Sequence, residues 1–209
     1  MQPPYPTDAD RRPTSRFCHI CGGRLRQADA ALRERPICDV CGAVHYAGPT
    51  VVVLAVVFAE DRMLLMRRGL PPYAGSWAPP GGYAEAGESL EAAAVRELDE
   101  EVGVRIDRAQ MVPHAMLSVP ALNQVCLCFI AMLERIVPLT PCPPEALEAR
   151  WFLEHEYPKS EIWGPAANFD IARLYDRVRT GRFDFYQRTD DAFRIISDGT
   201  QITYLWRRE

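Results

Sequence analysis

Three glutamates in one short stretch have the spacing of ligands on a helix. Glu97, Glu100 and Glu101 occupy positions i, i+3 and i+4, which are neighbours on a helical surface. Carboxylates held this close repel one another unless a cation lies between them. Magnesium binds such oxygen ligands and shares its coordination with substrate phosphates, so we expect a divalent cation and a phosphate compound. The alternative interpretation is a solvated acidic face.

A glycine-containing loop and an apolar stripe would position these carboxylates. Gly81, Gly82 and Gly87 precede the expected helix, and glycine lets the backbone approach a ligand closely. An apolar residue then recurs at every fourth position, which is typical of a helix face packed on a core. The stripe consists of Leu90, Ala94, Leu98 and Val102.

The stretch Gly82–Val104 resembles the Nudix box, Gx5Ex7REUxEExGU, in which U is an aliphatic residue. Every fixed position is filled, by Gly82, Glu88, Arg96, Glu97, Leu98, Glu100, Glu101, Gly103 and Val104. The resemblance implies an α/β fold, the α/β/α sandwich with a mixed β-sheet, and hydrolysis of a phosphoanhydride. It also implies that Glu97, Glu100 and Glu101 bind magnesium or manganese, while Glu88 and Arg96 hold the loop and helix in register.

The resemblance leaves the general base open, because the family places it on the box helix or on a loop beyond it. Glu97 is the candidate within the box. Glu148 is the downstream candidate and Glu85 is the third, although Glu148 could equally be an ordinary loop carboxylate. The expected substrate-binding residues are Arg67, Arg68, Tyr83, Gly81 and Gly82. Arginines can bind phosphate and tyrosine can stack on a base, but solvated arginines and core tyrosines are common.

Two CxxC pairs precede the box. Their cysteines are Cys18, Cys21, Cys38 and Cys41, and each pair is followed by glycine. This spacing is typical of a tetrahedral zinc site with four thiolates. Because four protein ligands leave no position for water, we expect structural zinc. Disulfides, unrelated thiols, or His19 or His45 as a substitute ligand are the alternatives.

Composition restricts the partners and the compartment. The chain has 209 residues, a net charge of −4 and a pI near 5.6, which disfavours nucleic acid as a general partner. Residues 1–50 are nevertheless mildly basic. No apolar run reaches the roughly 18 residues of a membrane helix, and the N-terminus lacks the apolar part of a secretory signal. We expect a cytoplasmic protein with reduced thiols.

The order of motifs predicts four segments: a mobile tail at 1–16, a zinc ribbon at 17–48, the hydrolase domain at 49–181 and a C-terminal hairpin extension at 182–209. The extension is a candidate homodimer contact or cover for the substrate pocket. Apolar strands are expected at 50–59 and 63–67, which form a hairpin about a polar turn. Period-two alternation predicts strands at 111–118 and 125–133, and a further strand is expected at 149–153. We expect an amphipathic helix at 166–180 and a hairpin that pairs 193–197 with 202–206.

The ribbon followed by the box resembles a zinc-ribbon branch of the Nudix family over about residues 17–155. Members are associated with NADH, FAD and ADP-ribose, which are cleaved to a mononucleotide and a phosphorylated remainder. The NADH pyrophosphatases carry SQPWPFPxS beyond the box, whereas this chain has SVPALNQ at 118–124. The resemblance therefore favours FAD or ADP-ribose over NADH. The alternative function is a regulator that senses a nucleotide or binds nucleic acid through the basic ribbon.

Overall fold

The computed structural model describes residues 15–27, 35–46, 48–71, 73–162, 171–181, 185–189 and 192–195. The tail predicted at 1–16 lies almost wholly outside these residues, as does the hairpin arm predicted at 202–206. The chain forms two compact units. The small unit contains residues 1–49 with 121–123, and the large unit contains residues 50–120 with 124–209.

The small unit is built on two short antiparallel strands. β1 (Leu25–Gln27) pairs with β2 (Pro36–Cys38), so that Arg26 lies opposite Ile37. Isolated bridges extend this ladder on both sides, from Phe17 to Arg24 and from Ile37 to Val44. The CxxC turns flank the resulting small sheet.

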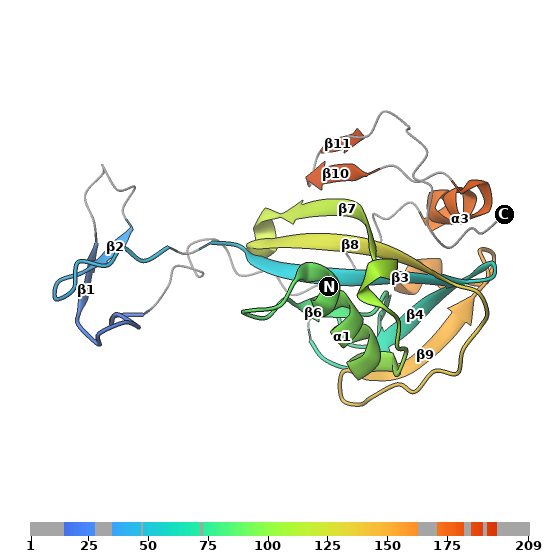
Figure 1. The fold of residues 1–209 in the computed structure, drawn as a ribbon, viewed down its shortest axis with the longest axis horizontal. Coiled ribbons are helices and arrows are strands. Elements are labelled where there is room, and N and C mark those ends of the chain that lie inside the picture. Colours follow the sequence, from blue (N-terminus) through green and yellow to red (C-terminus); the bar gives the residue numbers. More distant parts are fainter. Residues whose placement is uncertain are drawn as a thin grey trace. The chain divides into compact units, whose positions relative to one another are not determined.

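The large unit contains a nine-stranded mixed sheet (Figure 1). Its strands are β3 (Thr50–Ala59), β4 (Arg62–Arg68), β5 (Trp77–Ala78), β6 (Gly81–Tyr83), β7 (Val112–Val119), β8 (Gln124–Leu133), β9 (Ala146–Phe152), β10 (Tyr186–Thr189) and β11 (Ala192–Ile195). The order is β11-β10-β7-β8-β3-β4-β5, with β6 paired to β3 and β9 paired to β4. The β3–β8 and β7–β10 pairs are parallel and the others are antiparallel.

The central strand β3 is buried on both faces because helices cover each side. Val53, Ala55 and Val57 belong to the core that includes α1 (Leu90–Val102). The alternate residues of the strand belong to the core that includes α3 (Ile171–Thr180). A strand covered on both faces reads as a continuous apolar run, as this one does. The predicted α/β/α sandwich with a mixed sheet is confirmed.

Local signals fix the ends of α1. The Ser89 side chain accepts a hydrogen bond from the Ala92 amide at the N-terminus, which satisfies one of the unpaired amides of the first turn. Gly103 ends the helix with a φ of 72°, a left-handed conformation that glycine adopts without strain. The Thr140 amide then donates to the Val102 carbonyl, so the segment before β9 is tied to the end of the helix.

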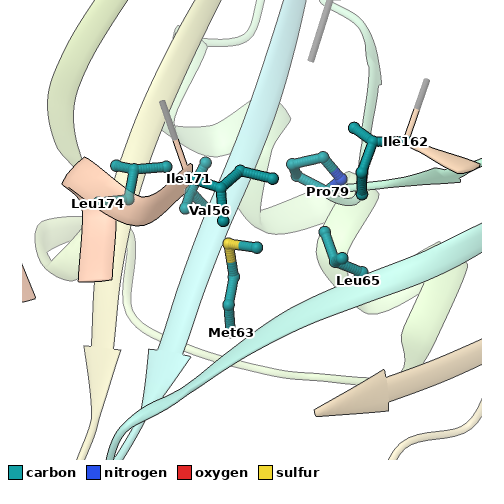
Figure 2. A pocket seen from close by; sticks show the side chains of 7 residues that line it. All are labelled: Val56, Met63, Leu65, Pro79, Ile162, Ile171 and Leu174. Carbon is teal, nitrogen blue, oxygen red and sulfur yellow. The ribbon is translucent and has the colours of Figure 1, made fainter. Parts of the chain in front are cut away.

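On the other face, α3 covers a small apolar pocket (Figure 2). Its lining consists of Val56, Met63, Leu65, Pro79, Ile162, Ile171 and Leu174. These side chains offer no donor or acceptor to a phosphate, so the pocket belongs to the core rather than to a nucleotide site. The described residues also include three short 3₁₀ segments: η3 (Arg108–Gln110), η4 (Pro120–Leu122) and η5 (Lys159–Glu161).

The C-terminal part contains a strand that the sequence analysis did not predict. The helix predicted at 166–180 is described from Ile171 to Thr180. β11 pairs with β10, and β10 continues the large sheet beside β7, whereas the partner predicted for 193–197 lies outside the described residues. The prediction missed β10 because Tyr186–Thr189 has no pronounced apolar alternation. Within the part of the chain described, no helix has the length and apolarity that a bilayer crossing requires.

Candidate metal and diphosphate site

The box glutamates separate onto two faces of α1. Glu97 and Glu101 are one helical turn apart and belong to the buried face, with exposed fractions of 8% and 5%. Glu100 lies between them in sequence, and its side chain is 57% exposed. A helix with 3.6 residues per turn places i and i+4 on the same side. Glu97 and Glu101 therefore form the inner pair, and Glu100 lies at the rim.

The backbone of the glycine pair lies directly against both inner carboxylates. The Gly81 amide donates a hydrogen bond of 2.7 Å to Oε2 of Glu101. At Gly82 a Cβ atom would lie only 2.5 Å from Oε1 of Glu97. β6 is held there by pairing with β3, which places Gly81 opposite Leu54 and Gly82 opposite Val53. The missing side chains allow the close approach.

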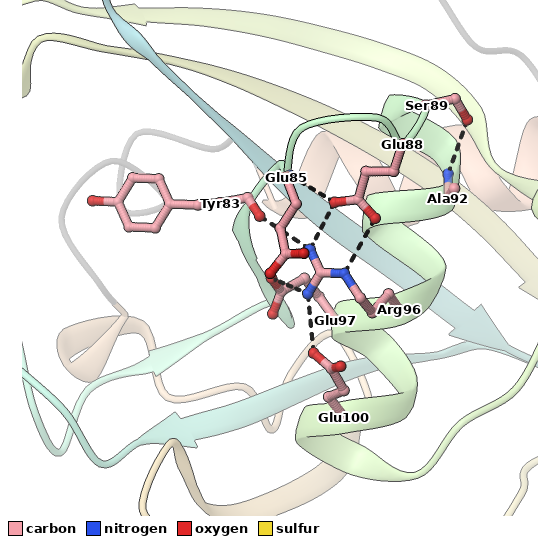
Figure 3. A network of polar contacts seen from close by, with 8 residues as sticks. All are labelled: Tyr83, Glu85, Glu88, Ser89, Ala92, Arg96, Glu97 and Glu100. Atoms are coloured by element: carbon pink, nitrogen blue, oxygen red, sulfur yellow. Dashed lines mark hydrogen bonds and ion pairs between the residues drawn. The ribbon is translucent and has the colours of Figure 1, made fainter. Parts of the chain in front are cut away.

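Arg96 connects the loop, the helix and the rim carboxylate (Figure 3). Its guanidinium donates two hydrogen bonds to Glu88, of 2.8 and 3.2 Å. It donates further bonds to Glu97 at 2.8 Å, to Glu100 at 3.0 Å and to the Tyr83 carbonyl at 3.1 Å. Arginine presents several donors in a fixed plane, so one side chain determines the orientation of three carboxylates.

The same network shifts the acidity of its members in opposite directions. Hydrogen bonds from Arg96 and from the Glu85 amide lower the pKa of Glu88. The bonds to Glu88, Glu97 and Glu100 raise the pKa of Arg96 despite its partial burial. The guanidinium and Glu88 therefore stay ionised, as an anchor between the loop and α1.

The two inner carboxylates behave differently, because burial dominates their titration. Burial raises the pKa of Glu101 to about 8, against the opposing effect of the Gly81 amide. Burial likewise raises the pKa of Glu97, although Arg96 opposes the shift. The charge of Glu145 adds to the increase at both residues. Ionised Glu97 and Glu101 thus need more positive charge than the surrounding side chains supply.

Sequence reasoning missed Glu145 as a member of this cluster. It directly precedes β9 and follows the proline-rich segment that is tied to α1, where the Cys142 amide donates to the Glu101 carbonyl. The Gly69 amide donates to the Glu145 carbonyl from the other side, at 2.8 Å. Only this tertiary path brings Glu145 near Glu97, and no periodicity in the sequence marks it.

The downstream glutamate that the sequence favoured lies elsewhere on β9. Glu148 is half-buried and lies opposite Arg67 in the β4–β9 ladder. Glu85 is in the loop before α1, with its amide bonded to Glu88. The structure therefore brings Glu97, Glu101 and Glu145 into one electrostatic group. Glu148 lies further along β9, opposite Arg67.

Arg67 and Arg68 have separate environments although they are adjacent. Arg67 is exposed and donates to the Gly75 carbonyl at 3.0 Å. Arg68 is half-buried, and its burial lowers its pKa while the charges of Glu101 and Tyr83 act in the opposite sense. Arg68 is thus the arginine of the pair that lies at the carboxylate cluster.

Tyr83 is the aromatic residue at the edge of this site. Its side chain is 57% exposed, and its hydroxyl accepts a hydrogen bond of 2.8 Å from the Gln124 amide group. Its carbonyl is held by Arg96. The ring is therefore fixed at both ends with a free face, which suits stacking on a base.

The donor set of the inner cluster fits a hard divalent cation. Carboxylate oxygens are the ligands that magnesium prefers, and a bound cation would compensate the charge whose burial raises the pKa of Glu101. The carboxylate oxygens do not converge on one point, however. The Arg96 guanidinium instead donates to Glu97 and Glu100. Of the residues that the structure describes, only the four cysteines form a converged group of three or more metal-ligand side chains.

The cysteine cluster of the small unit is fully converged. The sulfur atoms of Cys18, Cys21, Cys38 and Cys41 all lie within 4.8 Å of one another. Amides in both turns point at them, as from Gly23 to Cys21 and from Val40 to Cys38, each at 3.4 Å. The Cys41 and Val40 amides lower the pKa of the Cys38 thiol to about 6, which favours the thiolate that binds metal. His45 lies beside the cluster, with Nε2 3.2 Å from the Cys18 sulfur.

Comparisons with known proteins agree with this geometry. The profile of the NUDIX domain matches residues 48–172. The chain is similar to the crystal structure of a NUDIX hydrolase from Nitrosomonas europaea, at 30% identity and a TM-score of 0.69 over 84% of this chain and 99% of that one. The predicted family resemblance is confirmed.

Two curated relatives have names that mention substrates. One is the NAD-capped RNA hydrolase NudC of Stutzerimonas stutzeri (strain A1501), 33% identical over 80% of this chain and 58% of that protein. The other is the ADP-ribose pyrophosphatase of Methanocaldococcus jannaschii, 41% identical over 28% of this chain and 35% of that protein. The chain spans little more than half the length of the NudC relatives it matches. Both names are compatible with the predicted substrate class, but they give no preference for FAD over NAD-type compounds.

Proposed function

Because the chain belongs to the NUDIX family, we propose that it hydrolyses the diphosphate linkage of a nucleotide derivative in the presence of magnesium. The products are a mononucleotide and a phosphorylated remainder. The observation that carries the proposal is the pair of buried carboxylates, Glu97 and Glu101, held against the backbone of Gly81 and Gly82. Carboxylates buried at such cost are typical of functional sites.

In this proposal Glu97, Glu101 and Glu145 hold the cation from the protein side, with Glu100 at the rim. Magnesium, when bound, polarises the diphosphate and lowers the pKa of a bound water. Glu97 remains the candidate for the general base within the box, and in that role it would accept the proton of the attacking water instead of binding the cation. Two alternative bases remain: Glu148 on β9 and Glu85 in the loop before α1.

The remaining side chains bind and orient the substrate. Arg68 lies half-buried beside Glu101, so its guanidinium is placed to bind a phosphate oxygen next to the cation. Arg67 contacts the loop carbonyl of Gly75 and supports the rim. Tyr83 presents its exposed ring to a base. Arg96 keeps Glu97 and Glu88 oriented during turnover.

We assign the substrate to nucleotides of the NAD and ADP-ribose type. The names of the two curated relatives support this class. NADH, which the sequence analysis had ranked below FAD, is therefore again a candidate substrate. An RNA that carries NAD at its 5′ end contains the same diphosphate, and we include it as a substrate. Homodimer formation remains a prediction, which light scattering of the purified chain would check.

The cysteine cluster is assigned to structural zinc. Four converged sulfur atoms fill a tetrahedral site and leave no position for water. Such a site needs thiolates, so the proposal includes a reducing compartment such as the cytoplasm.

The test is a comparison of NADH, ADP-ribose, FAD and a nucleoside triphosphate, with mononucleotide release measured in magnesium and in manganese. We expect NADH and ADP-ribose to be cleaved, and Glu97→Gln to lower kcat/KM by about 10³-fold, equivalent to about 4 kcal/mol. Glu91→Gln on the first turn of the same helix is the matched control, and it should keep activity within about twofold. Absence of cleavage with either metal would overturn the proposal, and equal losses in both variants would remove Glu97 from the site.

A further inference from the structure

One face of the small unit collects arginines and aromatic rings. Side chains alternate along a strand, and directly paired residues lie on the same side of a ladder. Arg24 lies opposite Phe17, and Arg26 lies opposite Ile37. Ile37 in turn lies opposite Val44. These pairings place one set of residues on a common face.

At the other end of the same face, Arg35 contacts Tyr46 directly. Arg35 and Tyr46 continue the alternation from Ile37 and Val44, and the Arg35 guanidinium lies 4.6 Å from the centre of the Tyr46 ring. We call the resulting surface the basic aromatic face. It consists of Phe17, Arg24, Arg26, Arg35 and Tyr46. Cys18 and Cys38 occupy alternate positions, so the face is separate from the sulfur cluster.

The rings on this face are unusually open. Phe17 is 57% exposed and Tyr46 is 72% exposed. Arg24 and Arg26 are exposed as well, and Arg26 is paired with Asp39 at 2.9 Å. A small unit held by metal has little core of its own, which accounts for some exposure. It does not account for three arginines arranged around those rings in a chain whose net charge is −4.

We propose that the basic aromatic face binds a single-stranded stretch of RNA. Guanidinium groups neutralise phosphates, and exposed rings stack on unpaired bases. A duplex would keep its bases stacked on one another and leave the rings unused, whereas an acidic peptide would engage only the arginines. The choice of RNA rests on the proposed function, in which an RNA carrying a 5′ NAD is a substrate.

Direct binding tests this inference without any hydrolysis. The full zinc-loaded chain is titrated against a labelled, uncapped 20-nucleotide single strand of RNA, and anisotropy is followed at several salt concentrations. For single strands, each phosphate contact adds about 0.7 to the steepness with which the logarithm of the binding constant falls with the logarithm of the salt concentration. At 0.1 M salt this corresponds to about fivefold in affinity for each contact, relative to 1 M salt. The double variant Arg24→Gln/Arg26→Gln should therefore bind about 25-fold more weakly with a slope smaller by about 1.4. Tyr46→Ser should lose about tenfold.

The matched control removes the same charge from the large unit. Arg105 and Arg108 are both exposed, and Arg105→Gln/Arg108→Gln should leave RNA affinity within about twofold. Zinc content verifies that each face variant retains its cluster. Competition by a duplex or by polyglutamate as strong as that by the single strand would overturn the inference, as would equal affinity in the face and control variants.

Hydrolysis of NADH by the same variants separates this inference from the proposed function. NADH carries no RNA chain, so Arg24→Gln/Arg26→Gln should cleave it at the wild-type rate while its KM for NAD-capped RNA rises. If NADH is cleaved normally and RNA binding is insensitive to the face, the inference fails alone. If no diphosphate is cleaved but RNA binding depends on the face, the proposed function fails and the binding surface stands.

Discussion

The described residues contain two clusters of candidate metal ligands, which are assembled by different means. The cysteine cluster comes from two tight turns, and its sulfur atoms converge within 4.8 Å. The carboxylate cluster draws Glu97 and Glu101 from α1, and Glu145 from the start of β9. The Arg96 guanidinium donates to Glu97 of this cluster and to Glu100 at its rim. The cysteine site needs only two turns that are close in sequence and the metal proposed for it, whereas the carboxylate site needs segments that only the fold of the large unit brings together.

The contrast extends to the role of backbone amides. In the small unit, the Cys41 and Val40 amides lower the pKa of Cys38 to about 6, whereas at Cys21 the Gly23 amide acts in the same sense but the neighbouring cysteines raise the pKa to about 12. At Glu101 the Gly81 amide has the same sense, but burial exceeds it and the pKa rises to about 8. We infer that metal is needed for structure in the first cluster, and that it compensates buried charge in the second.

The largest effect is expected from Cys38→Ser, which removes one sulfur ligand. Metal binding in isolated zinc fingers supplies about 10–16 kcal/mol of folding free energy, so the small unit should lose both zinc and its fold. All four tryptophans lie beyond residue 49. Thermal unfolding followed by tryptophan fluorescence therefore reports on the large unit. We expect that transition to shift by no more than about 1 °C.

The control for this variant is Cys142→Ser, since Cys142 is exposed and outside the cluster. It should keep one zinc per chain by metal analysis. Zinc retention by Cys38→Ser would show that His45, 3.2 Å from Cys18, can replace a thiolate. In that case the metal site of the small unit would not require all four cysteines.

The pH dependence of stability tests the carboxylate cluster. The folded-state pKa of Glu101 is about 8 and its ordinary value is 4.5, so the folded state holds the proton more tightly. This contribution is fully present below about pH 4.5 and is lost as the pH rises through about 8, by up to a few kcal/mol. Glu97 acts in the same direction. Without magnesium, urea unfolding should show falling stability of the large unit from pH 5 to pH 8.5.

Glu101→Gln provides the reference for this titration. Its amide oxygen still accepts from the Gly81 amide, but the side chain no longer ionises, so stability should fall less with pH than in the wild type. Magnesium should restore wild-type stability at pH 8.5 and leave the variant almost unchanged. Identical pH profiles for the two proteins would mean that Glu101 ionises at its ordinary pKa, and the proposed need for a cation would fail.

Gly82→Ala tests the close approach between backbone and Glu97. The new Cβ would lie 2.5 Å from Oε1 of Glu97, so the carboxylate must move. A displacement of about 1 Å can cost about 100-fold in rate, and we expect kcat to fall by about 10- to 100-fold. Stability measured by urea unfolding should change by no more than about 1 kcal/mol, because the end of a flexible side chain can shift.

Gly81→Ala is the neighbouring comparison. There the Cβ would lie 2.1 Å from the Val53 carbonyl, which belongs to the central strand and cannot move freely. This variant should lose stability as well as activity. If Gly82→Ala retains its wild-type kcat, the position of Glu97 does not limit the reaction.

Local spacing explains why much of the two clusters could be predicted from the sequence. The CxxC turns and the helical spacing of Glu97, Glu100 and Glu101 depend on neighbours only a few residues away, and the family pattern supplied the sandwich. Glu145 and β10 could not be predicted in this way. The position of Glu145 depends on the Cys142 amide bonding to the Glu101 carbonyl, and β10 depends on pairing with β7. The separation of Arg67 from Arg68 also required the observed strand contacts.

The smallest effect is expected from Ser89→Ala at the start of α1. The change removes the acceptor for the Ala92 amide and should cost about 1 kcal/mol of unfolding free energy. Glu97 and Glu101 lie two or more turns away and are held by other contacts, such as the Gly81 amide bond to Glu101. We therefore expect kcat and KM to stay within about twofold, with Ser89→Asp recovering the stability. A large loss of kcat in Ser89→Ala with the fold intact would mean that the helix start determines the carboxylate positions, and the site would then depend on a local signal as the cysteine cluster does.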